Sequence, residues 1–516
     1  MSIYLNKSSI SIYKGMIGVN IMDASISVYK ISVIENTSTI LYENDSLNSV
    51  ISYMTGLTIT APITIRFNTN DTHTMTGGHW NINYSNGSNL LTVKAAAGKS
   101  PTIDGQSQSG VYAVMTVGTD NFVWDGVNII NGYTSNTEDG RTIVRLSGYN
   151  LNITIKNCLI KQGYCGIRGT ELITGLTIND VTFQSINQGS IRVGYQVWTN
   201  GNMYEDFDSR PDYEYDIHDL LVYNIISIDN LSGGNVSGTT EPFGGFILIK
   251  GTKNCEVRDI ITTKSVNIEE SYNVLLNRIV NSNVYNTGIT IRGEGTDNLT
   301  ISNCFIKTLS GNTDTMVYLN ICRNLSLIHN SFIGINQFDT LNIARIKRIL
   351  KVVGNLFSFD YNTPFSANID TNTNGTPYSG SMITDFQVEH DNVIMDNNQY
   401  GDTLYIGNVL NGGVDALRVR VSNYGGAILS TTGYTTTYTG YGVNTSFIDT
   451  EFITITTRTD PNTSTSPAYY LGSSDTSNHG RNMISSSVDS LAVTDLRGYT
   501  RTYPTDAGAV DRDAVT

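Results

Sequence analysis

The residues from 195 to 219 carry the densest set of chemically useful side chains in the sequence. This stretch, "YQVWTNGNMYEDFDSRPDYEYDIHD", mixes aromatic rings with carboxylates. Aromatic faces stack on the C–H surfaces of sugars, and carboxylates accept hydrogen bonds from sugar hydroxyls, so the stretch predicts contact with a glycan. The candidate glycan-binding residues are Tyr195, Trp198, Tyr204, Tyr213 and Tyr215. The alternative is a surface loop whose aromatic residues anchor a neighbouring subunit.

The same stretch is the place to look for catalysis. Glycoside hydrolysis needs two carboxyl groups about 5 to 9.5 Å apart, and the candidates here are Asp206, Asp208 and Asp212. The three aspartates lack the spacing and the closing glutamate of a calcium-binding loop. We therefore predict neither a metal site nor a cofactor.

Carboxylates and histidines elsewhere have simpler interpretations. Asp180 and Asp259 occupy a repeat position at which Asn and Gly occur as readily, which indicates a backbone corner rather than a catalytic acid. Asp125 precedes such a corner and is expected to face solvent. Of six histidines only His218, beside Asp219, has a setting that would suit catalysis, and a lone histidine is more often structural.

A nonapeptide repeat supplies the elements that must position these residues. Its copies are "NFVWDGVNI", "NITIKNCLI", "GLTINDVTF", "DLLVYNIIS", "NCEVRDIIT", "NVLLNRIVN" and "NLTISNCFI", beginning at residues 121, 152, 175, 219, 254, 273 and 298. Apolar residues or cysteine at the second and fourth positions indicate a strand with one side in a core. The sixth position is Gly, Asn or Asp in six of the seven copies. These residues best tolerate a left-handed corner, after which the seventh position returns to the core. A looser copy, "NLSLIHNSF" at 324, is interpreted as carrying one extra residue.

The copies start 31, 23, 44, 35, 19 and 25 residues apart, and the looser copy follows after 26. Periods of this length indicate a solenoid. The predicted fold is all-β: a right-handed, single-stranded parallel β-helix whose coils stack about 4.8 Å apart. The interval of 44 residues contains the 195–219 stretch, which therefore leaves the coil as a long loop. The next interval holds a second insertion, "NLSGGNVSGTTEPFGGF", and the two insertions together would wall a groove along one face.

These motifs resemble those of right-handed parallel β-helix proteins of the pectate-lyase-like kind. In that group an Asn or Asp at the start of a coil is followed by the same order of apolar residues and a corner Asn. The resemblance extends over about residues 85 to 400. It implies the fold and leaves the activity open, because lyases, hydrolases, adhesins and phage tailspikes share this scaffold.

The two ends differ from the repeat, so we expect three regions: 1–60, 61–402 and 403–516. The first is expected to be β-rich and contains a short echo, "ISIYKG" and "ISVYKI", that resembles the N-termini of tailed-phage structural proteins. The last is β-rich, and its closing segment is similar to that of many bacterial and phage β-helix proteins. The matching residues are Asp495, Gly498, Arg501, Asp506, Gly508 and Ala509. This resemblance implies a segment that seals the coil stack or makes a trimer contact, since open ends would expose strand edges.

Composition excludes several classes of protein. The net charge of -14 argues against binding to nucleic acid or to an anionic membrane surface. The sequence contains no stretch of about 18 apolar residues, so no membrane-spanning segment is predicted. The N-terminus lacks the apolar core of a signal peptide, so synthesis in a cytoplasm is expected. Five cysteines without CxxC spacing indicate buried free thiols.

Together these features favour a virion structural protein of a tailed phage. It would be a tailspike- or fibre-like adhesin that contacts a host surface polysaccharide as a homotrimer and joins other virion proteins through its N-terminal region. Two alternatives stay open: a polysaccharide depolymerase, either hydrolase or lyase, on the same scaffold, and a purely structural virion component.

Overall fold

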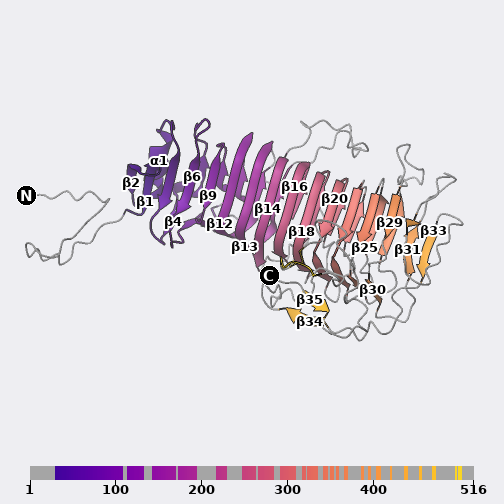
Figure 1. Cartoon of the computed structure of the whole chain (residues 1–516). Helices are drawn as coiled ribbons and strands as arrows, with labels where there is room; N and C mark the ends of the chain where they lie inside the picture. Colours follow the sequence, from indigo (N-terminus) through magenta and orange to yellow (C-terminus); the bar gives the residue numbers. More distant parts are fainter. Residues whose placement is uncertain are drawn as a thin grey trace, which may run out of the picture.

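The computed structural model describes most of the chain up to residue 334 and short segments beyond. The described ranges are 29–108, 113–132, 142–169, 172–194, 217–228, 247–262, 265–283, 291–308, 317–320, 322 and 324–334, with strands up to 471 and the segments 494–496 and 498–502. Figure 1 shows the strands stacked one after another along a single axis. Successive coils pair in parallel, as in Ile129 with Ile160 and Val274 with Leu299. The predicted all-β parallel β-helix is confirmed.

Each coil contributes a strand to three parallel faces, which we name A, B and C. Face A contains β5 (Trp80–Ile82), β8 (Ala113–Val117), β11 (Thr142–Leu146), β15 (Ile247–Lys250), β17 (Val266–Glu269), β19 (Ile291–Glu294), β22 (Val317–Asn320), β25 (Leu341–Ile346), β28 (Phe365–Ile369) and β31 (Thr403–Gly407). Face B contains β3 (Ile63–Phe67), β6 (Leu91–Ala95), β9 (Phe122–Asp125), β20 (Asp297–Ser302), β23 (Asn324–Ile328), β26 (Ile349–Val353), β29 (Asp385–Val388) and β32 (Val419–Arg420). Face C contains β4 (Thr72–Thr74), β7 (Thr102–Asp104), β10 (Asn128–Ile130), β21 (Phe305–Thr308), β24 (Ser331–Gly334), β27 (Leu356–Phe359) and β30 (Val393–Asp396).

Five long strands turn corners without losing their pairing. They are β12 (Asn150–Gly169) and β13 (Ile173–Val193), which run through faces B, C and A, and β14 (Ile217–Ile228), β16 (Thr252–Thr262) and β18 (Tyr272–Asn283), which run through faces B and C. Parallel pairing continues beyond residue 402, because Ser366 of β28 pairs with Tyr405 of β31, and Phe386 of β29 pairs with Val419 of β32. Two antiparallel pairings follow, β31 with β33 (Thr435–Thr439) and β34 (Phe452–Ile455) with β35 (Ala468–Leu471).

The corner between faces B and C forms at the sixth position of the repeat. The backbone φ there is positive in all seven copies, from +52° at Asn303 to +76° at Gly126. This confirms the predicted corner, including the positions of Asp180 and Asp259. It also includes Arg278, at φ +53°.

The first position of the repeat is a second left-handed corner, between faces A and B. Its φ lies between +49° at Asn121 and +74° at Gly175. Asparagine is favoured here for a further reason, since its side-chain amide bonds to the coil before. Asn273 donates to the Oδ1 of Asn254 (2.9 Å) and Asn298 donates to the Oδ1 of Asn273 (2.9 Å). The repeat therefore begins with a ladder of amides.

The looser copy at 324 contains no extra residue, and that interpretation was wrong. Leu325 and Leu327 pair with Leu299 and Ile301, and His329 occupies the corner at φ +51°. The next residue, Asn330, replaces the usual apolar residue and is buried. Its Oδ1 accepts a hydrogen bond from the backbone N–H of Cys304 (2.9 Å), and its Nδ2 donates to the carbonyl of Ile301 (2.8 Å). The buried, hydrogen-bonded amide of Asn330 interrupts the hydrophobic pattern, and this interruption was interpreted as an inserted residue.

Cysteines act as small core residues in this stack. All five are buried and unpaired with one another, as predicted. Burial raises the pKa of the Cys158 and Cys304 thiols to about 12, so neither is a thiolate at neutral pH.

The N-terminal end of the solenoid is closed by a small cap. β1 (Ile31–Glu35) pairs antiparallel with both β2 (Thr39–Asn44) and β3. Helix α1 (Leu47–Thr55) buries Leu47, Val50 and Met54 against the core. The described part of the region predicted to be β-rich, residues 29–60, thus contains a helix, and a short 3-10 turn (η1, Thr76–Gly78) follows in the first coil. No helix among the described residues is long and apolar enough to cross a membrane.

Candidate functional site

The predicted binding and catalytic residues all lie outside the described residues. They are Tyr195, Trp198, Tyr204, Tyr213 and Tyr215 for glycan contact and Asp206, Asp208 and Asp212 for catalysis. The described strands show where their segment leaves and rejoins the solenoid. β13 ends at Val193 on face A, and β14 begins at Ile217, two residues before its corner between faces A and B at Asp219.

The second insertion joins the other edge of the same face. β14 ends at Ile228 on face C, and β15 begins at Ile247 on face A. Ile191 pairs with Ile247, and Val193 pairs with Ile249, so these two face A strands lie side by side. The two insertions are therefore attached to opposite edges of face A on adjacent coils.

A glycine begins the exit of the first insertion. Gly194 has φ +85°, and a Cβ at this position would overlap the carbonyl oxygen of Lys250 in the neighbouring coil. Its N–H donates to the carbonyl of Gly169 (2.8 Å). The chain thus stays paired with the coil before up to the residue at which the insertion leaves.

Face A presents three arginines in register beside this exit. Arg145 of β11 pairs with Arg168 of β12, and Arg168 pairs with Arg192 of β13. All three side chains are half-buried, while the residues on either side of each in sequence are buried. Because side chains alternate along a strand, the arginines point outward. We name Arg145, Arg168 and Arg192 the arginine ladder.

The outward positions on either side of the arginine ladder have a different character. Thr116 precedes it, with its hydroxyl 3.1 Å from the Nε2 of His79. Leu248 and Asn267 follow it and are only 8% and 2% exposed. The arginines are therefore more accessible than the two residues that follow them in this row.

An exposed aromatic residue lies beside the arginine ladder. Tyr149, in the turn that follows β11, is 81% exposed, and Leu151, at the start of β12, is 49% exposed. This turn belongs to the edge between faces A and B. The 195–216 insertion leaves the same edge two coils later. Tyr149 is therefore an exposed aromatic side chain at this edge of face A.

These four residues were not among the candidates predicted from the sequence. A usable signal was present in "IVRL", "GIRG" and "SIRV", each with Arg after Ile or Val. Arg145 and Arg168 each lie seven residues before the start of a repeat copy. The insertion after Arg192 breaks that spacing, which hides the third member of the set.

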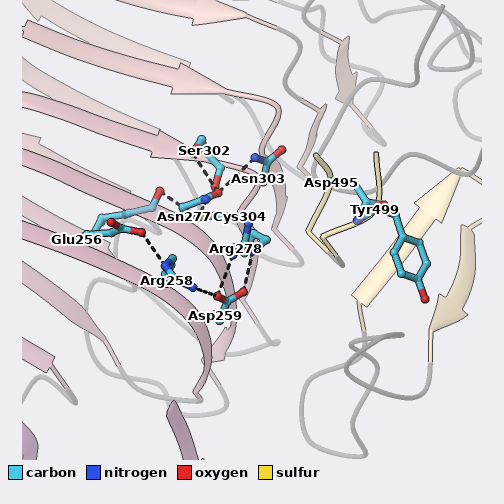
Figure 2. A network of polar contacts seen from close by, with 11 residues as sticks. Glu256, Arg258, Asp259, Asn277, Arg278, Ser302, Asn303, Cys304, Asp495 and Tyr499 are labelled. Carbon is cyan, nitrogen blue, oxygen red and sulfur yellow. Dashed lines mark hydrogen bonds and ion pairs between the residues drawn. The ribbon is translucent and has the colours of Figure 1, made fainter. Parts of the chain in front are cut away.

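The corner between faces B and C carries a second polar cluster, shown in Figure 2. Arg278 donates from Nε and Nη2 to the two oxygens of Asp259 (2.7 and 2.8 Å). Arg258 also contacts Asp259 (2.8 Å) and Glu256 (2.6 Å), and its guanidinium lies 4.4 Å from the centre of the Tyr223 ring.

This cluster holds the carboxylate of Asp259 in the ionised form. Burial by itself raises the pKa of Asp259, but the hydrogen bonds and charges of Arg278 and Arg258 outweigh it, and the net shift is downward. A general acid needs the opposite shift. Asp259 is therefore a structural residue, as the corner interpretation expected. Asp125 likewise forms an ion pair, with Lys156 at 3.4 Å.

The C-terminal motif joins the coil beside this cluster. Asp495 and Arg501 are buried, and the Nη2 of Arg501 donates to the Oδ1 of Asn303 (3.1 Å). Asp495 and Tyr499, labelled in Figure 2, close a tight turn in which Gly498 has φ +85° and Asp495 Oδ1 accepts from the N–H of Tyr499 (3.1 Å). The described part of the motif thus contacts the side of the solenoid.

Two further chemical candidates, His218 and Asp219, are among the described residues. His218 lies within β14, in register with Thr174 and Lys253, and Asp219 accepts a hydrogen bond from Asn254 (3.0 Å) at the face A–B corner. No group of three or more His, Cys, Asp or Glu in the described part of the chain could hold a metal ion.

Comparison with known proteins gives little beyond this geometry. No protein-family model matches the chain, and no curated protein matches it. Among solved structures, the A-module of mannuronan C-5 epimerase AlgE6 from Azotobacter vinelandii is 10% identical, with a TM-score of 0.33 over 74% of this chain and 91% of that one. The assignment of the fold accordingly rests on the strand pairing itself.

Proposed function

We propose that the chain is an adhesin that binds a surface polysaccharide along face A. The observation that carries this proposal is the attachment of the two insertions to opposite edges of that face on adjacent coils. Long loops on a rigid scaffold are the usual carriers of binding function. An extended polymer lying along the solenoid axis on face A would contact both insertions and the arginine ladder.

The biological setting is part of the same proposal. The chain acts as a tailspike- or fibre-like component of a tailed-phage virion, joined to other virion proteins through its N-terminal region, and works as a homotrimer. The "IYKG" echo and the similarity of the C-terminal motif to phage β-helix proteins support this setting. Mass spectrometry of purified particles should detect the protein. Sedimentation of the recombinant chain should give a trimer, and a monomer at micromolar concentration would remove the homotrimer from the proposal.

Glycan binding is tested by replacing aromatic residues of the first insertion. Trp198→Ala and Tyr204→Ala should each weaken binding to purified host capsule or lipopolysaccharide about tenfold or more, because stacked aromatic residues dominate such contacts. Tyr29→Ala, a partly exposed aromatic residue at the N-terminal cap, is the control. Unchanged binding of both insertion variants, with unchanged melting temperature, would remove the insertion from the site.

The same samples decide between an adhesin and a depolymerase. An adhesin leaves the polysaccharide intact, so incubation should release neither reducing ends nor unsaturated ends. Release of either, abolished by Asp206→Asn, Asp208→Asn or Asp212→Asn, would establish the depolymerase instead.

A further inference from the structure

We infer that the corner between faces A and B carries a binding site for the hydroxyl groups of a neutral polysaccharide. This inference rests on the proposed function and names the class of ligand. The site is built on Asn254, Asn273 and Asn298, which start three successive copies of the repeat and are all exposed; we name them the amide ladder. Their strands, β16, β18 and β20, follow one another along the solenoid axis (Figure 1). Equivalent atoms are therefore about 4.8 Å apart, along the direction in which a polymer would lie.

The hydrogen bonds within the amide ladder use only part of each amide. Asn254 donates to the Oδ1 of Asp219 (3.0 Å), and its own Oδ1 accepts from Asn273 (2.9 Å). Asn273 in turn accepts from Asn298 (2.9 Å). A primary amide has two N–H donors and two lone pairs on its oxygen. Asn254 and Asn273 thus each keep one N–H and one lone pair beyond those that hold the corner together.

A hydroxyl group matches these remaining groups. It donates one hydrogen bond and accepts others, so it can bond to the N–H of one amide and to the oxygen of the next. One such contact replaces bonds to water at little net gain. A polysaccharide presents hydroxyls repeatedly, so after the first contact the others form within one complex and their effects accumulate. The regular spacing of the amide ladder therefore favours a polymer over a single sugar.

The surroundings of the amide ladder add an aromatic ring and link it to the first insertion. Tyr272 immediately precedes Asn273 at the same edge and is half-buried. Its ring can contact the C–H surface of a sugar whose hydroxyls reach the amides. The first acceptor of the ladder, Asp219, lies two residues after β14 begins, and the 195–216 insertion ends at the start of that strand. A polymer along this edge would contact both the insertion and the amide ladder.

Charge favours a neutral polymer over an acidic one. The amides carry no charge, and the first acceptor of the ladder is the carboxylate of Asp219. The chain as a whole has a net charge of -14, which repels polyanions. Arg168 and Arg192 on face A each have an interaction within the protein, so the arginine ladder does not require an anionic ligand.

A shorter run of corner amides lies before the insertion and provides a matched control. Asn152 donates to the Oδ1 of Asn121 (3.0 Å), and Gly175 occupies the next corner. Asn121 is half-buried, so this run has one exposed amide where the amide ladder has three. Gly175 also shows that glycine fits this corner, at φ +74°. An Asn-to-Gly change therefore removes the amide and leaves the backbone conformation accessible.

The test measures binding of the full-length protein to four immobilised polymers by biolayer interferometry. Dextran and mannan are the neutral probes, and polygalacturonate and dextran sulfate are the acidic ones. The variant Asn254→Gly/Asn273→Gly/Asn298→Gly removes the amide ladder. Asn121→Gly/Asn152→Gly is the control. Where only the capsule or lipopolysaccharide of the host binds, the same variants are measured on that polysaccharide.

We expect the wild-type protein to bind a neutral polymer more tightly than either acidic one. The affinity should change little between about 50 and about 500 mM salt, because salt screens charges and leaves amide contacts in place. The ladder variant should lose about tenfold in affinity, and the Asn121/Asn152 control far less. Tyr272→Ala should also lose about tenfold, whereas Tyr272→Phe keeps the ring and should bind nearly as wild type does. The two Tyr272 variants decide the matter if the ladder variant does not fold.

The opposite outcomes separate this inference from the proposed function. Tighter binding to an acidic polymer, or binding that salt abolishes, overturns the inference and leaves glycan binding in place. The same holds if the ladder and Tyr272 variants bind as wild type does while Trp198→Ala still weakens binding. An equal loss in the Asn121/Asn152 control would assign the effect to loosened corners and also overturn the inference. Binding to none of the four polymers, and to neither polysaccharide of the host, overturns the proposed function as well.

Discussion

Arg278 shows how one residue can break the rule of its position and still be stabilised there. It occupies a left-handed corner at φ +53°, where the other six copies of the repeat have Gly, Asn or Asp. A long side chain in this conformation costs of order 1 kcal/mol or more. The bidentate pair with Asp259, at the same corner of the neighbouring coil, offsets that cost. At Arg278 the ion pair with Asp259 determines the residue type, in place of the preference of Gly, Asn and Asp for a left-handed corner.

Replacing Asp259 by Asn tests this account at the residue scale. At about pH 7 the variant should lose about 1–3 kcal/mol of unfolding free energy, because Arg278 and Arg258 lose a shared, partly buried carboxylate. The pKa of Asp259 is lowered in the folded state. Its contribution is therefore complete above the unfolded pKa near 3.9 and is lost as the pH falls through the folded value.

Urea unfolding at about pH 7 and about pH 3 measures both effects. The gap between wild type and Asp259→Asn should narrow at the lower pH. Asp125→Asn is the matched control, since it breaks the more exposed pair with Lys156 and should cost at most about 1 kcal/mol. A gap that stays constant with pH would contradict the assigned role of the charge.

At the scale of elements, the nonapeptide predicts two faces of the coil and leaves the third hidden. Faces B and C meet at a single corner residue, so their apolar positions keep a fixed spacing in the sequence. Face A is joined to them by turns that vary from a few residues to a whole insertion, as between Val193 and Ile217. The register of the face A strands, which aligns the three arginines of the arginine ladder, is set by hydrogen bonding between strands that are far apart in the sequence. A pattern of fixed period cannot reveal a row of that kind.

The positive φ at the first position was missed for a different reason. Asn273 and Asn298 fit the start of a strand as well as they fit a corner, because nothing in the sequence shows the amide ladder that links them. Asn330 led to the wrong prediction of an extra residue, because a polar residue at a core position suggests a loop when its hydrogen bonds are not known. In both cases the decisive contact joins residues about 25 positions apart.

Helix α1 in the N-terminal cap should stabilise the coils that lie next to it. Met54 is fully buried where the helix covers the first coil, so Met54→Ala should lower the unfolding free energy by about 2–5 kcal/mol. Ser52→Ala on the exposed side of the same helix is the control and should be nearly neutral. Hydrogen exchange should show the loss first in β3 and β6, because solenoid coils are stabilised mainly by their neighbours. Uniform loss of protection through β23 would contradict that local coupling.

At the scale of the whole molecule, the C-terminal motif adds a contact that nearest-neighbour stacking does not provide. Arg501 and Asn303 are 198 residues apart in the sequence, and their side chains are hydrogen-bonded and buried. Coils in a simple solenoid interact only with adjacent coils. The hydrogen bond between Arg501 and Asn303 therefore makes the folding of the closing segment depend on the folding of the coil that contains Asn303. The described part of the segment "DLRGYTR" thus binds the side of the solenoid, and we name the contact between Arg501 and Asn303 the clasp.

A double-mutant cycle tests whether this clasp stabilises the protein. Arg501→Ala should cost about 1–3 kcal/mol of unfolding free energy, because it removes a buried hydrogen bond to the corner amide of Asn303. Asn303→Ala also loses the bond to Asn277 and the amide that suits the left-handed corner. The double variant should be less unstable than the sum of the two, with a coupling of roughly 0.5–3 kcal/mol. Thr500→Ala, exposed and next in sequence, is the control. Strictly additive losses would mean that the two side chains do not interact in solution, and the closing segment would then need another docking site.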